Sequence, residues 1–488
     1  MATSHARVLV LTISLFFTSA LSVCTNISAV VPGEVFLPNT SAYNSSLASY
    51  FFLGEQTQTP DYIIAPTSSS DVARVIKAID SCACLVSVRS GGHSPNAGFS
   101  NGDSGITIDL RGNDEISLNE DASIVSVGSG ALWIDVYKSL EPLNRTVVGA
   151  RVADVGLGGF LTGGGLSFFS PRYGFGCDNV QNMEVVLANG SIVNANETSN
   201  PRLFRALKGG QNNFGIVTRF DLITHPQVPF WGGILQYPES ADQDQMAAFA
   251  AFKMAPYDPY AEVEQTFVYF GALQSFSSTN NLFYTGPTKN TTLHYFLDIQ
   301  PQTTNTLRTS TASDFAEEIK TLQPTDQFAV YATLSFQISE GVLEQVYELW
   351  KSQTSSVAVS IPNITSVLTF QSIPPPPAAD ASPNSLPFKP ESTPQDNVVL
   401  LLLNFYWSDV ADSAFIQDQM QFLTTSVQSL VGSDIEFKYL NYAASWQDPL
   451  AGYGKASVQE LRETAQLYDP NGFFQKVIRG GFKLNNNF

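Results

Sequence analysis

Histidine and cysteine are both scarce in this chain, with four of each among 488 residues. Four cysteines are too few for a disulfide scaffold, and a chain of this length does not need one to fold. Basic residues are also few, because 25 Lys and Arg stand against 44 Asp and Glu and give a net charge of −19. This excess of negative charge repels nucleic acid and anionic membrane surfaces, so we expect neither as a partner.

Long apolar runs are lacking too, since no stretch beyond the N-terminal region reaches the roughly 18 apolar residues that a transmembrane helix needs. The N-terminal region itself has the layout of a secretory signal over residues 1–23. Arg7 precedes an apolar run from Val8 to Phe17, and small residues follow. We therefore expect a secreted protein that is a monomer or a weak dimer.

Two further features fit the secretory pathway. Glycosylation is predicted at the sequons of Asn26, Asn39, Asn44, Asn144, Asn196, Asn290 and Asn363. An eighth sequon, Asn189, precedes Gly190 and predicts a tight hairpin turn equally well. One disulfide is predicted between Cys24 and Cys82, which would hold the mature N-terminus, and Cys84 is the competing partner.

Glycine clusters mark the first half of the chain. A predicted helix over Asp71–Ser81 and a buried strand over Leu85–Val88 lead into the glycine loop of Arg89–Pro95. A second stretch, Gly156 to Gly165, has six glycines in ten positions, so the backbone must approach something closely there. Helix, strand and glycine loop in succession predict a site for a phosphate-bearing ligand.

Several familiar sites are excluded by spacing. Leu161 stands where a Rossmann fingerprint starting at Gly156 needs a small residue, and Ile216 stands where a P-loop needs lysine. No nucleophile elbow of a serine hydrolase occurs. His225 and His294 are far apart and join no cluster of ligands, so no metal site is predicted.

The second half of the chain, from about residue 229, has elements such as Gln327–Gln337 and Val398–Tyr406 without glycine clusters and predicts an α+β domain. The Pro- and Ser-rich segment Pro374–Pro394 is predicted to be an external loop or the edge of a lid. In the first half, His93 sits on a backbone loop rather than on an apolar face. It can serve as a nucleophile or an acid/base, or it can merely hydrogen-bond the backbone.

Five segments occur in an order that identifies a family. They are Val88–His93, Val155–Gly165, Tyr173–Val180, Leu207–Val217 and Tyr439–Tyr442. Together they resemble the berberine-bridge-enzyme-like FAD-linked oxidases of fungal type, in the vanillyl-alcohol oxidase superfamily. The resemblance implies an α+β fold with a PCMH-type FAD-binding domain at residues 24–227, a substrate domain on an antiparallel sheet at 228–435, and a C-terminal segment, 436–488, that returns to the FAD domain.

The resemblance also implies how FAD is held. The ring of His93 is expected to carry the flavin through its 8α-methyl group. The other implied cofactor residues are Arg89, Ser90, Gly91, Gly92, Ser94, Asp154, Val155, Gly158, Gly159, Gly163, Gly164, Asp178, Asn179, Val180, Gly215 and Val217. Val152 occupies the position where many relatives attach flavin to a cysteine, so single attachment is expected. Cys177 is interpreted as a buried inert thiol in preference to a second link.

Tyr442 and Asn441 are the catalytic residues that the resemblance implies, with Tyr442 as the base. We expect Tyr439–Tyr442 to be a strand, with Leu440 and Tyr442 on one face. A phenol with a pKa near about 10 needs a cationic or hydrogen-bonding neighbour, which the sequence does not name, to act as a base near neutrality. Alternatively, Tyr442 only packs over the flavin ring.

The implied reaction removes a hydride from a small organic substrate, at an alcohol, an amine or a benzylic or allylic carbon, and reduces O₂ to H₂O₂. A secondary metabolite is the expected substrate. Two alternatives stay open. One is a carbohydrate oxidase, which shares the fold, and the other is a protein that uses its flavin as a scaffold for cyclisation without net oxidation.

Overall fold

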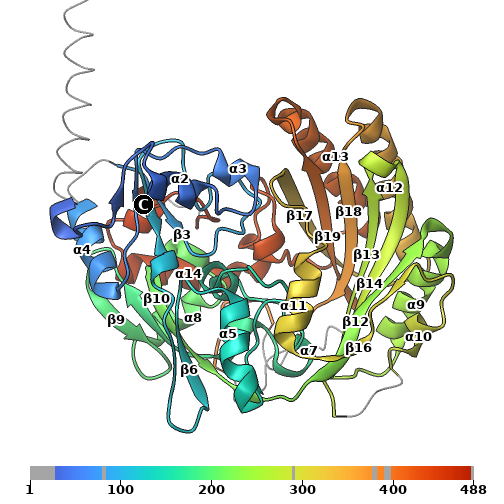
Figure 1. Cartoon of the computed structure of the whole chain (residues 1–488), viewed down its shortest axis with the longest axis horizontal. Coiled ribbons are helices and arrows are strands. Elements are labelled where there is room, and N and C mark those ends of the chain that lie inside the picture. The colour runs from blue at the N-terminus through green and yellow to red at the C-terminus, as the bar shows by residue number, and fades with distance from the viewer. Residues whose placement is uncertain (1–27, 80–83, 288–291, 376–381, 389–396, 485–488) are drawn as a thin grey trace, which may run out of the picture.

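The computed structural model describes residues 28–79, 84–287, 292–375, 382–388 and 397–484. Within these ranges the chain forms two lobes (Figure 1). The first lobe contains the blue to green elements and the red C-terminal residues, and the second contains the yellow-green to orange strands and their helices. The predicted signal peptide lies outside the described residues, and so do Cys24, Cys82, Asn26 and Asn290.

The first lobe holds two sheets. The four-stranded sheet has parallel pairs between β2 and β4 and between β4 and β3, and the five-stranded sheet is antiparallel. In sheet order the strands are β1 (Val35–Phe36), β2 (Tyr62–Ile64), β4 (Ile106–Asp109) and β3 (Val86–Arg89), then β5 (Ile116–Leu118), β6 (Ile124–Gly128), β10 (Ile216–Ile223), β8 (Val180–Val186) and β9 (Ile192–Ala195). A short pair, β7 (Arg145–Thr146) with β11 (His225–Pro226), completes the lobe.

Helices cover these sheets. They are α2 (Ser41–Leu47), α3 (Leu53–Gln56), α4 (Ser69–Ile79), α5 (Trp133–Leu140), α6 (Leu157–Thr162), α7 (Ser170–Tyr173) and α8 (Pro201–Leu207). Helix α4 illustrates why they form: Val72, Val75 and Ile76 recur at helical spacing and are fully buried. The Ser68 hydroxyl accepts a hydrogen bond from the Asp71 amide at 3.2 Å and so begins the helix two residues before the predicted start.

The second lobe is built on one antiparallel sheet, as the sequence predicts. Its order is β15 (Thr304–Asn305), β12 (Phe230–Pro238), β14 (Ser275–Tyr284), β13 (Ala261–Phe270), β18 (Thr365–Ser372), β19 (Val398–Trp407) and β17 (Phe328–Gln337), with β16 (Arg308–Ser310) paired to β12. The longer helices of the lobe are α9 (Asp242–Met254), α11 (Ala312–Lys320), α12 (Val342–Ser360) and α13 (Ser413–Val431), and α10 (His294–Leu297) is short. The predicted α+β class is therefore confirmed.

Alternate residues of each long strand face opposite ways. Phe267, Leu368 and Leu403 are fully buried in a core that also contains apolar residues of α9, α12 and α13. Their neighbours on the same strands, such as Thr266 and Asn404, instead line a cavity on the side of the first lobe. The sheet thus has one face covered by helices and one face free to bind a ligand.

The C-terminal residues return to the first lobe. Helix α14 (Lys455–Tyr468) packs against α8, and α15 (Phe473–Lys476) precedes a bridge between Ile478 and Val86. The Val86 amide donates to the Val477 carbonyl at 2.9 Å, and the Arg479 amide donates to the Val86 carbonyl at 2.6 Å. Strand β3 is therefore paired on its open side by the end of the chain.

The described part of the segment Pro374–Pro394 is buried, whereas the sequence predicts an external loop. Asn384, Ser385, Leu386 and Phe388 are buried, and the Ser385 amide donates to the Lys208 carbonyl at 2.9 Å. Apolar Leu386 and Phe388 belong to the core of the first lobe. The prediction of an external loop was therefore wrong for residues 382–388, because the apolar side chains between the prolines anchor the segment.

The surface features predicted for secretion lie as follows. Asn39, Asn44, Asn144 and Asn363 are exposed, whereas Asn196 is half-buried and its amide donates to Asn182.

Cys84 forms a disulfide, which favours the alternative in which Cys84 is a partner over the predicted Cys24–Cys82 pair. Across the ranges that the structure describes, no helix combines the length and apolarity needed to span a bilayer.

Candidate functional site

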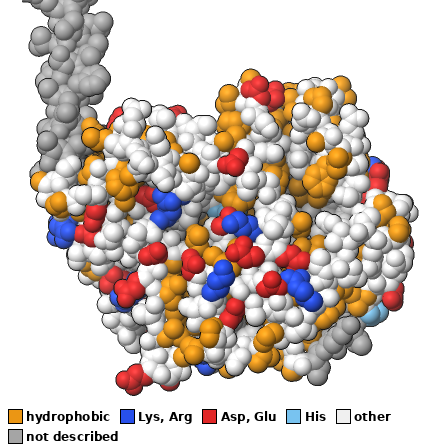
Figure 2. Space-filling model, in the orientation of Figure 1, with side chains coloured by type: hydrophobic (Ala, Val, Ile, Leu, Met, Phe, Trp, Pro, Cys, Tyr) orange, Lys and Arg blue, Asp and Glu red, His pale blue; other side chains and the backbone are white. Residues whose placement is uncertain are grey.

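A cavity of about 430 Å³ lies where the two lobes meet. Its walls come from the two glycine-rich segments of the first lobe, from the free face of the second-lobe sheet and from residues 439–442. Figure 2 shows a notch between the lobes, with acidic and basic side chains gathered below it. The glycine segments and the sheet face each other across this space, which is the arrangement that a cofactor and its substrate require.

The loop after β3 is held in place by Arg89. Its fully buried guanidinium donates to the carbonyls of Ser46 at 2.7 Å and Ser49 at 2.9 Å, and it lies 3.8 Å from an Asp109 carboxylate oxygen. Arg89 also stacks on the ring of Tyr50. The Arg89 side chain thus supports the loop from behind and does not line the cavity.

The two glycine segments touch through their backbones. A Cβ atom added to Gly91 would lie 2.5 Å from the Gly156 nitrogen, so neither position tolerates a side chain without movement. The Ser90 hydroxyl joins the same pair of segments, because it accepts from the Gly158 amide at 3.1 Å. Gly159 differs, since a Cβ there would meet no atom of the described residues within 4 Å and would enter the cavity.

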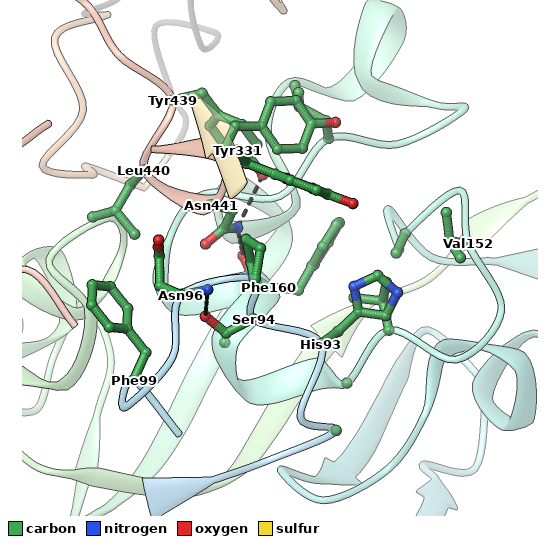
Figure 3. A pocket seen from close by; sticks show the side chains of 18 of the residues that line it. His93, Ser94, Asn96, Phe99, Val152, Phe160, Tyr331, Tyr439, Leu440 and Asn441 are labelled. Carbon is green, nitrogen blue, oxygen red and sulfur yellow. Dashed lines mark hydrogen bonds between the residues drawn. The ribbon is translucent and has the colours of Figure 1, made fainter. Parts of the chain in front are cut away.

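His93 projects from this loop toward the cavity (Figure 3). Its ring packs on Phe51 at 4.1 Å between centroids, and its Nε2 atom lies 3.9 Å from a carboxylate oxygen of Asp154. Nε2 is buried and has no hydrogen-bond partner within the described part of the chain. Burial lowers the pKa of His93, and the nearby Asp154 carboxylate opposes this effect. The ring is therefore neutral and nucleophilic at neutral pH.

The cavity brings together most, but not all, of the predicted cofactor residues. Those that line it are Ser90, Gly91, Gly92, His93, Ser94, Val155, Gly158, Gly159, Gly215 and Val217. Those outside its lining are Arg89, Asp154, Gly163, Gly164, Asp178, Asn179 and Val180. Of the second group, Arg89 holds the His93 loop from behind and Asp154 lies beside the His93 ring.

The segment Tyr173–Val180 holds three residues of the second group, Asp178, Asn179 and Val180. The Asp178 carboxylate accepts from the Phe175 amide at 2.9 Å and from the Asn384 side chain, and the Asn179 amide donates to the Phe175 carbonyl. Cys177 is free and completely buried outside the cavity, and burial raises the pKa of its thiol. This environment is that of an inert thiol.

Residues 439–442 form a different structure from the predicted strand. Leu440–Tyr442 is a turn of 3₁₀ helix, and Tyr439 precedes it. Side chains three residues apart align in a 3₁₀ helix, so the rings of Tyr439 and Tyr442 meet at 4.8 Å between centroids instead of lying on opposite faces. The strand prediction was wrong, but Asn441 and Tyr442 both line the cavity.

Asn441 ties this turn to the second glycine segment. Its amide nitrogen donates to the Phe160 carbonyl at 3.1 Å and to the Tyr439 hydroxyl at 3.0 Å (Figure 3). The Tyr439 hydroxyl also accepts from the Gly165 amide at 3.0 Å. The Asn96 side chain, from the His93 loop, donates to the Ala443 carbonyl at 2.9 Å. These hydrogen bonds fix the position of the turn that carries Tyr442 relative to the glycine segments.

Arg151 is the neighbour of Tyr442 that the sequence did not name. Its Nη2 atom donates to the Tyr442 hydroxyl at 3.1 Å and to the Gln371 Oε1 atom at 2.7 Å, and lies 3.0 Å from a Glu264 carboxylate oxygen. Its Nη1 atom pairs with Glu262 at 2.5 Å. Arg151 comes from the first lobe and all its acidic partners from β13, so one buried cation joins the lobes at the cavity.

Burial and charge oppose each other in this cluster. Burial raises the pKa of Tyr442, and the Arg151 guanidinium acts to lower it. Burial likewise raises the pKa of Glu262, and the Arg151 guanidinium acts to lower it. Without Arg151 the Tyr442 phenol would hold its proton more tightly still. The cation therefore makes Tyr442 a better base than its burial alone would allow.

The cavity fits the cofactor that the resemblance implies. Among its lining residues the charged or chargeable ones besides tyrosine are Arg151, Glu264 and His93, and Arg151 is already paired. A pyrophosphate there would be bound by backbone amides of the glycine segments, since no free basic side chain of the described residues lines the wall. The open surface at Gly159 and the unpartnered Nε2 of His93 leave room and a reactive atom for a flavin.

Comparison with known proteins supports the same assignment. A family model described as an FAD binding domain matches residues 60–196. The FAD-dependent monooxygenase tpcD of Cochliobolus heterostrophus is 35% identical over 91% of this chain and 89% of its own length. The FAD-dependent monooxygenase drtC of Aspergillus calidoustus is 31% identical over 95% of this chain and 90% of its own.

Solved structures show the fold. The 6-hydroxy-D-nicotine oxidase of Arthrobacter nicotinovorans matches 92% of this chain and 97% of its own with a TM-score of 0.76 at 20% identity. The xylooligosaccharide oxidase of Myceliophthora thermophila, solved with xylobiose, matches 95% of this chain and all of its own with a TM-score of 0.74 at 19% identity. The predicted two-domain fold with an antiparallel substrate sheet is confirmed.

Proposed function

This chain belongs to the berberine-bridge-enzyme-like family of FAD-linked oxidoreductases, and from that premise we propose that it oxidises a small organic substrate by hydride removal, with O₂ as the electron acceptor. That it is an FAD-dependent oxidoreductase follows from the family. The relatives named above are fungal monooxygenases by name, and a secondary metabolite is the substrate class that we propose for this chain.

The observation that carries the proposal is the hydrogen bond of 3.1 Å from Arg151 to the Tyr442 hydroxyl at the cavity wall. Tyr442 takes the proton of the substrate's O–H or N–H group, and Arg151 stabilises the phenolate that this requires. Because burial raises the pKa of Tyr442, the reactive form is a minor species at neutral pH. FAD, when bound, supplies the hydride acceptor and the route of the electrons to oxygen.

We further propose that His93 carries the flavin covalently and alone. The support is the position of its neutral ring at the cavity and the unpartnered Nε2 atom. Val152, at the position of the second attachment in relatives, lines the cavity without a thiol.

The first experiment is a visible spectrum of the purified protein before and after acid precipitation. Yellow colour that stays with the pellet, and that His93→Ala releases, is the expected result. His294→Ala, in the short helix α10, is the matched control and should behave as the wild type. Colour in the supernatant of the wild type would overturn the covalent link, and a protein without flavin would overturn the proposed function.

The second experiment tests the reaction itself. Benzylic and allylic alcohols, amines and oligosaccharides are screened for anaerobic bleaching of the flavin and for peroxide in air. Tyr442→Phe should slow bleaching by about 10²- to 10⁴-fold, the range for loss of a general base. Tyr237→Phe, a buried tyrosine of the distant core, is the control. Bleaching without peroxide would contradict the oxygen step alone.

We also propose that the protein is secreted and carries N-linked glycans. The exposed sequon residues Asn39, Asn44, Asn144 and Asn363 are the glycosylation sites that we retain among the described residues. Asn196 is less suited, because its side-chain oxygen and nitrogen already hold the turn through Thr198 and Asn182. Deglycosylation should lower the mass of the protein purified from its native host. Replacement of the four exposed asparagines should abolish this mass shift, and that result would support the assignment.

A further inference from the structure

A carboxylate and an imidazole face each other at the edge of the cavity. The Asp154 Oδ1 atom lies 3.9 Å from the His93 Nε2 atom, and both atoms are buried. Neither atom has a hydrogen-bond partner among the residues that the structure describes. A buried carboxylate oxygen without a partner is unfavourable, so positive charge on the His93 ring would stabilise this arrangement.

Helix α11 of the second lobe holds the other side of the Asp154 carboxylate. The Nζ atom of Lys320, the last residue of α11, lies 3.5 Å from Asp154 Oδ2. The Ala153 amide, one residue before Asp154, donates to the Ala316 carbonyl of the same helix at 3.3 Å. These two contacts tie the loop of Asp154 to α11 and leave the Oδ1 atom toward His93.

The neighbours of the His93 ring have opposite effects on its charge. Burial lowers the pKa of His93, so the ring is neutral before it reacts. The Asp154 carboxylate favours the positively charged ring, and Lys320 opposes it with a smaller effect. The aromatic ring of Phe51, 4.1 Å away between centroids, also favours a cation. These surroundings suit a ring that starts neutral and gains positive charge during a reaction.

Covalent attachment of flavin to His93 would produce that charge. When a neutral ring nitrogen bonds to the 8α carbon, the imidazole becomes cationic until it loses its remaining N–H proton. One C–H bond of the 8α-methyl group breaks, its proton goes to solvent, and its electron pair passes to the flavin ring. O₂ then accepts these two electrons with two protons and leaves as H₂O₂. The net reaction joins FAD to histidine and consumes one O₂.

We propose that Asp154 is a positioning residue for this attachment, and that its carboxylate stabilises the positive charge that the His93 ring gains as the bond to flavin forms. The inference rests on the proposed covalent link at His93 and assigns a residue to the reaction that makes the link. Asp154 does not line the cavity, so it acts through the ring of His93. Stabilisation of a charge that exists only during the reaction raises the rate without tighter binding of FAD.

The time course of acid-stable flavin tests this inference without any substrate. Protein synthesis in the expressing host is blocked, the protein is purified at intervals, and total and acid-stable flavin are measured per chain. Asp154→Asn keeps the shape of the side chain and removes its charge. Its total flavin should match the wild type, while its acid-stable share should rise about 100-fold more slowly. Asp154→Glu keeps the charge and should attach flavin within about ten-fold of the wild-type rate.

Glu317→Gln is the matched control. Glu317 also belongs to α11 and lies 3.8 Å from a lysine, Lys138 of α5, but it does not line the cavity. Loss of this carboxylate should leave the attachment rate unchanged. If Asp154→Asn does not accumulate as folded protein, Asp154→Ser provides the same comparison with a neutral side chain.

The order of the two Asp154 variants separates charge from packing, because asparagine fits the space of aspartate and glutamate does not. Attachment by Asp154→Asn within about two-fold of the wild type, or slower attachment by Asp154→Glu than by Asp154→Asn, overturns the inference. Wild-type protein whose flavin is all released by acid would overturn the inference together with the covalent link. Attachment is measured in protein that has met no substrate, so a chain that attaches flavin normally and oxidises nothing would contradict the proposed function alone.

Discussion

The guanidinium of Arg151 touches the hydroxyl of Tyr442 across 291 residues of sequence, at a distance of 3.1 Å. The bond joins the glycine-rich lobe to the turn that follows the substrate sheet. Two carboxylates, Glu262 and Glu264, hold the same guanidinium from the opposite lobe. The position of the proposed base therefore depends on the relative position of the two lobes.

Arg151→Lys should slow flavin reduction and move its pH dependence upward. Arg151 lowers the pKa of Tyr442 against the effect of burial, and lysine cannot keep all four contacts of the planar guanidinium. Loss of a charge-assisted hydrogen bond predicts a decrease of roughly 10- to 100-fold at neutral pH. The rate should rise with pH through the Tyr442 pKa, and this rise should begin at higher pH in the variant.

Stopped-flow reduction at a series of pH values measures both effects. Arg145→Lys is the control, because Arg145 bonds Thr224 in the first lobe and does not line the cavity. An Arg151→Lys profile that coincides with the wild type would show that Tyr442 does not work through this contact.

Gly159→Ala should separate cofactor binding from folding. The added Cβ meets no protein atom within 4 Å and replaces a helical glycine, which favours the helix by about 1 kcal/mol. The same atom enters the space that we assign to FAD, so flavin content should fall while the unfolding midpoint of the flavin-free protein stays equal or rises. Gly54→Ala, in helix α3 outside the cavity, should keep full flavin content. Equal flavin content in both variants would place the cofactor elsewhere.

Glu55 predicts a loss of stability as pH rises from about 4.5 to about 7. Burial raises its pKa to about 7, against hydrogen bonds from the Ser100 hydroxyl and amide and the Phe99 amide. The folded state binds a proton over this window that the unfolded state has lost, so unfolding becomes easier as pH rises. Glu55→Gln keeps the accepting oxygen without the charge. It should exceed the wild type by about 2–3 kcal/mol at pH 8 and match it near pH 5.

Denaturant unfolding at the two pH values makes this comparison. Asp326→Asn, which changes an exposed carboxylate that accepts from Gln56, controls for the loss of one surface charge near the same helix. A stability difference for Glu55→Gln that is the same at both pH values would contradict the assigned pKa.

Cys177→Ala should leave the flavin attached. The thiol is completely buried outside the cavity, so it cannot meet a flavin in the described arrangement. The smaller side chain should lower the free energy of unfolding by about 1 kcal/mol through the space that it leaves. Acid precipitation followed by a spectrum of the pellet checks the attachment, and release of flavin by this variant would revive the second link.

The sequence predicted the glycine walls of the site because glycine is required where Gly91 and Gly156 touch, and no side chain could replace either. The sequence also predicted that His93 and Tyr442 belong to the site, and both line the cavity. It missed the 3₁₀ turn, since a four-residue stretch with aromatic residues favours a strand by propensity alone. The bonds of Asn441 to Phe160 and of Asn96 to Ala443, which hold the turn, join distant parts of the chain.

The sequence of β13 could have indicated that a cation lies nearby. Glu262 and Glu264 are two carboxylates on one face of a strand rich in apolar residues, and such a pair is stable when buried only if a cation reaches it. Nothing local, however, connects them to Arg151, which stands in a loop of the other lobe. The identity of a partner across two lobes is fixed by tertiary packing, whereas the need for a partner is visible in the strand.

The bridge between Ile478 and Val86 also protects the molecule against association with itself. Strand β3 carries the loop that bears His93, and its outer edge is paired by residues 477–479 through the amide and the carbonyl of Val86. Removal of those residues would leave unpaired backbone groups at the edge of a sheet, which can pair with a strand of another chain.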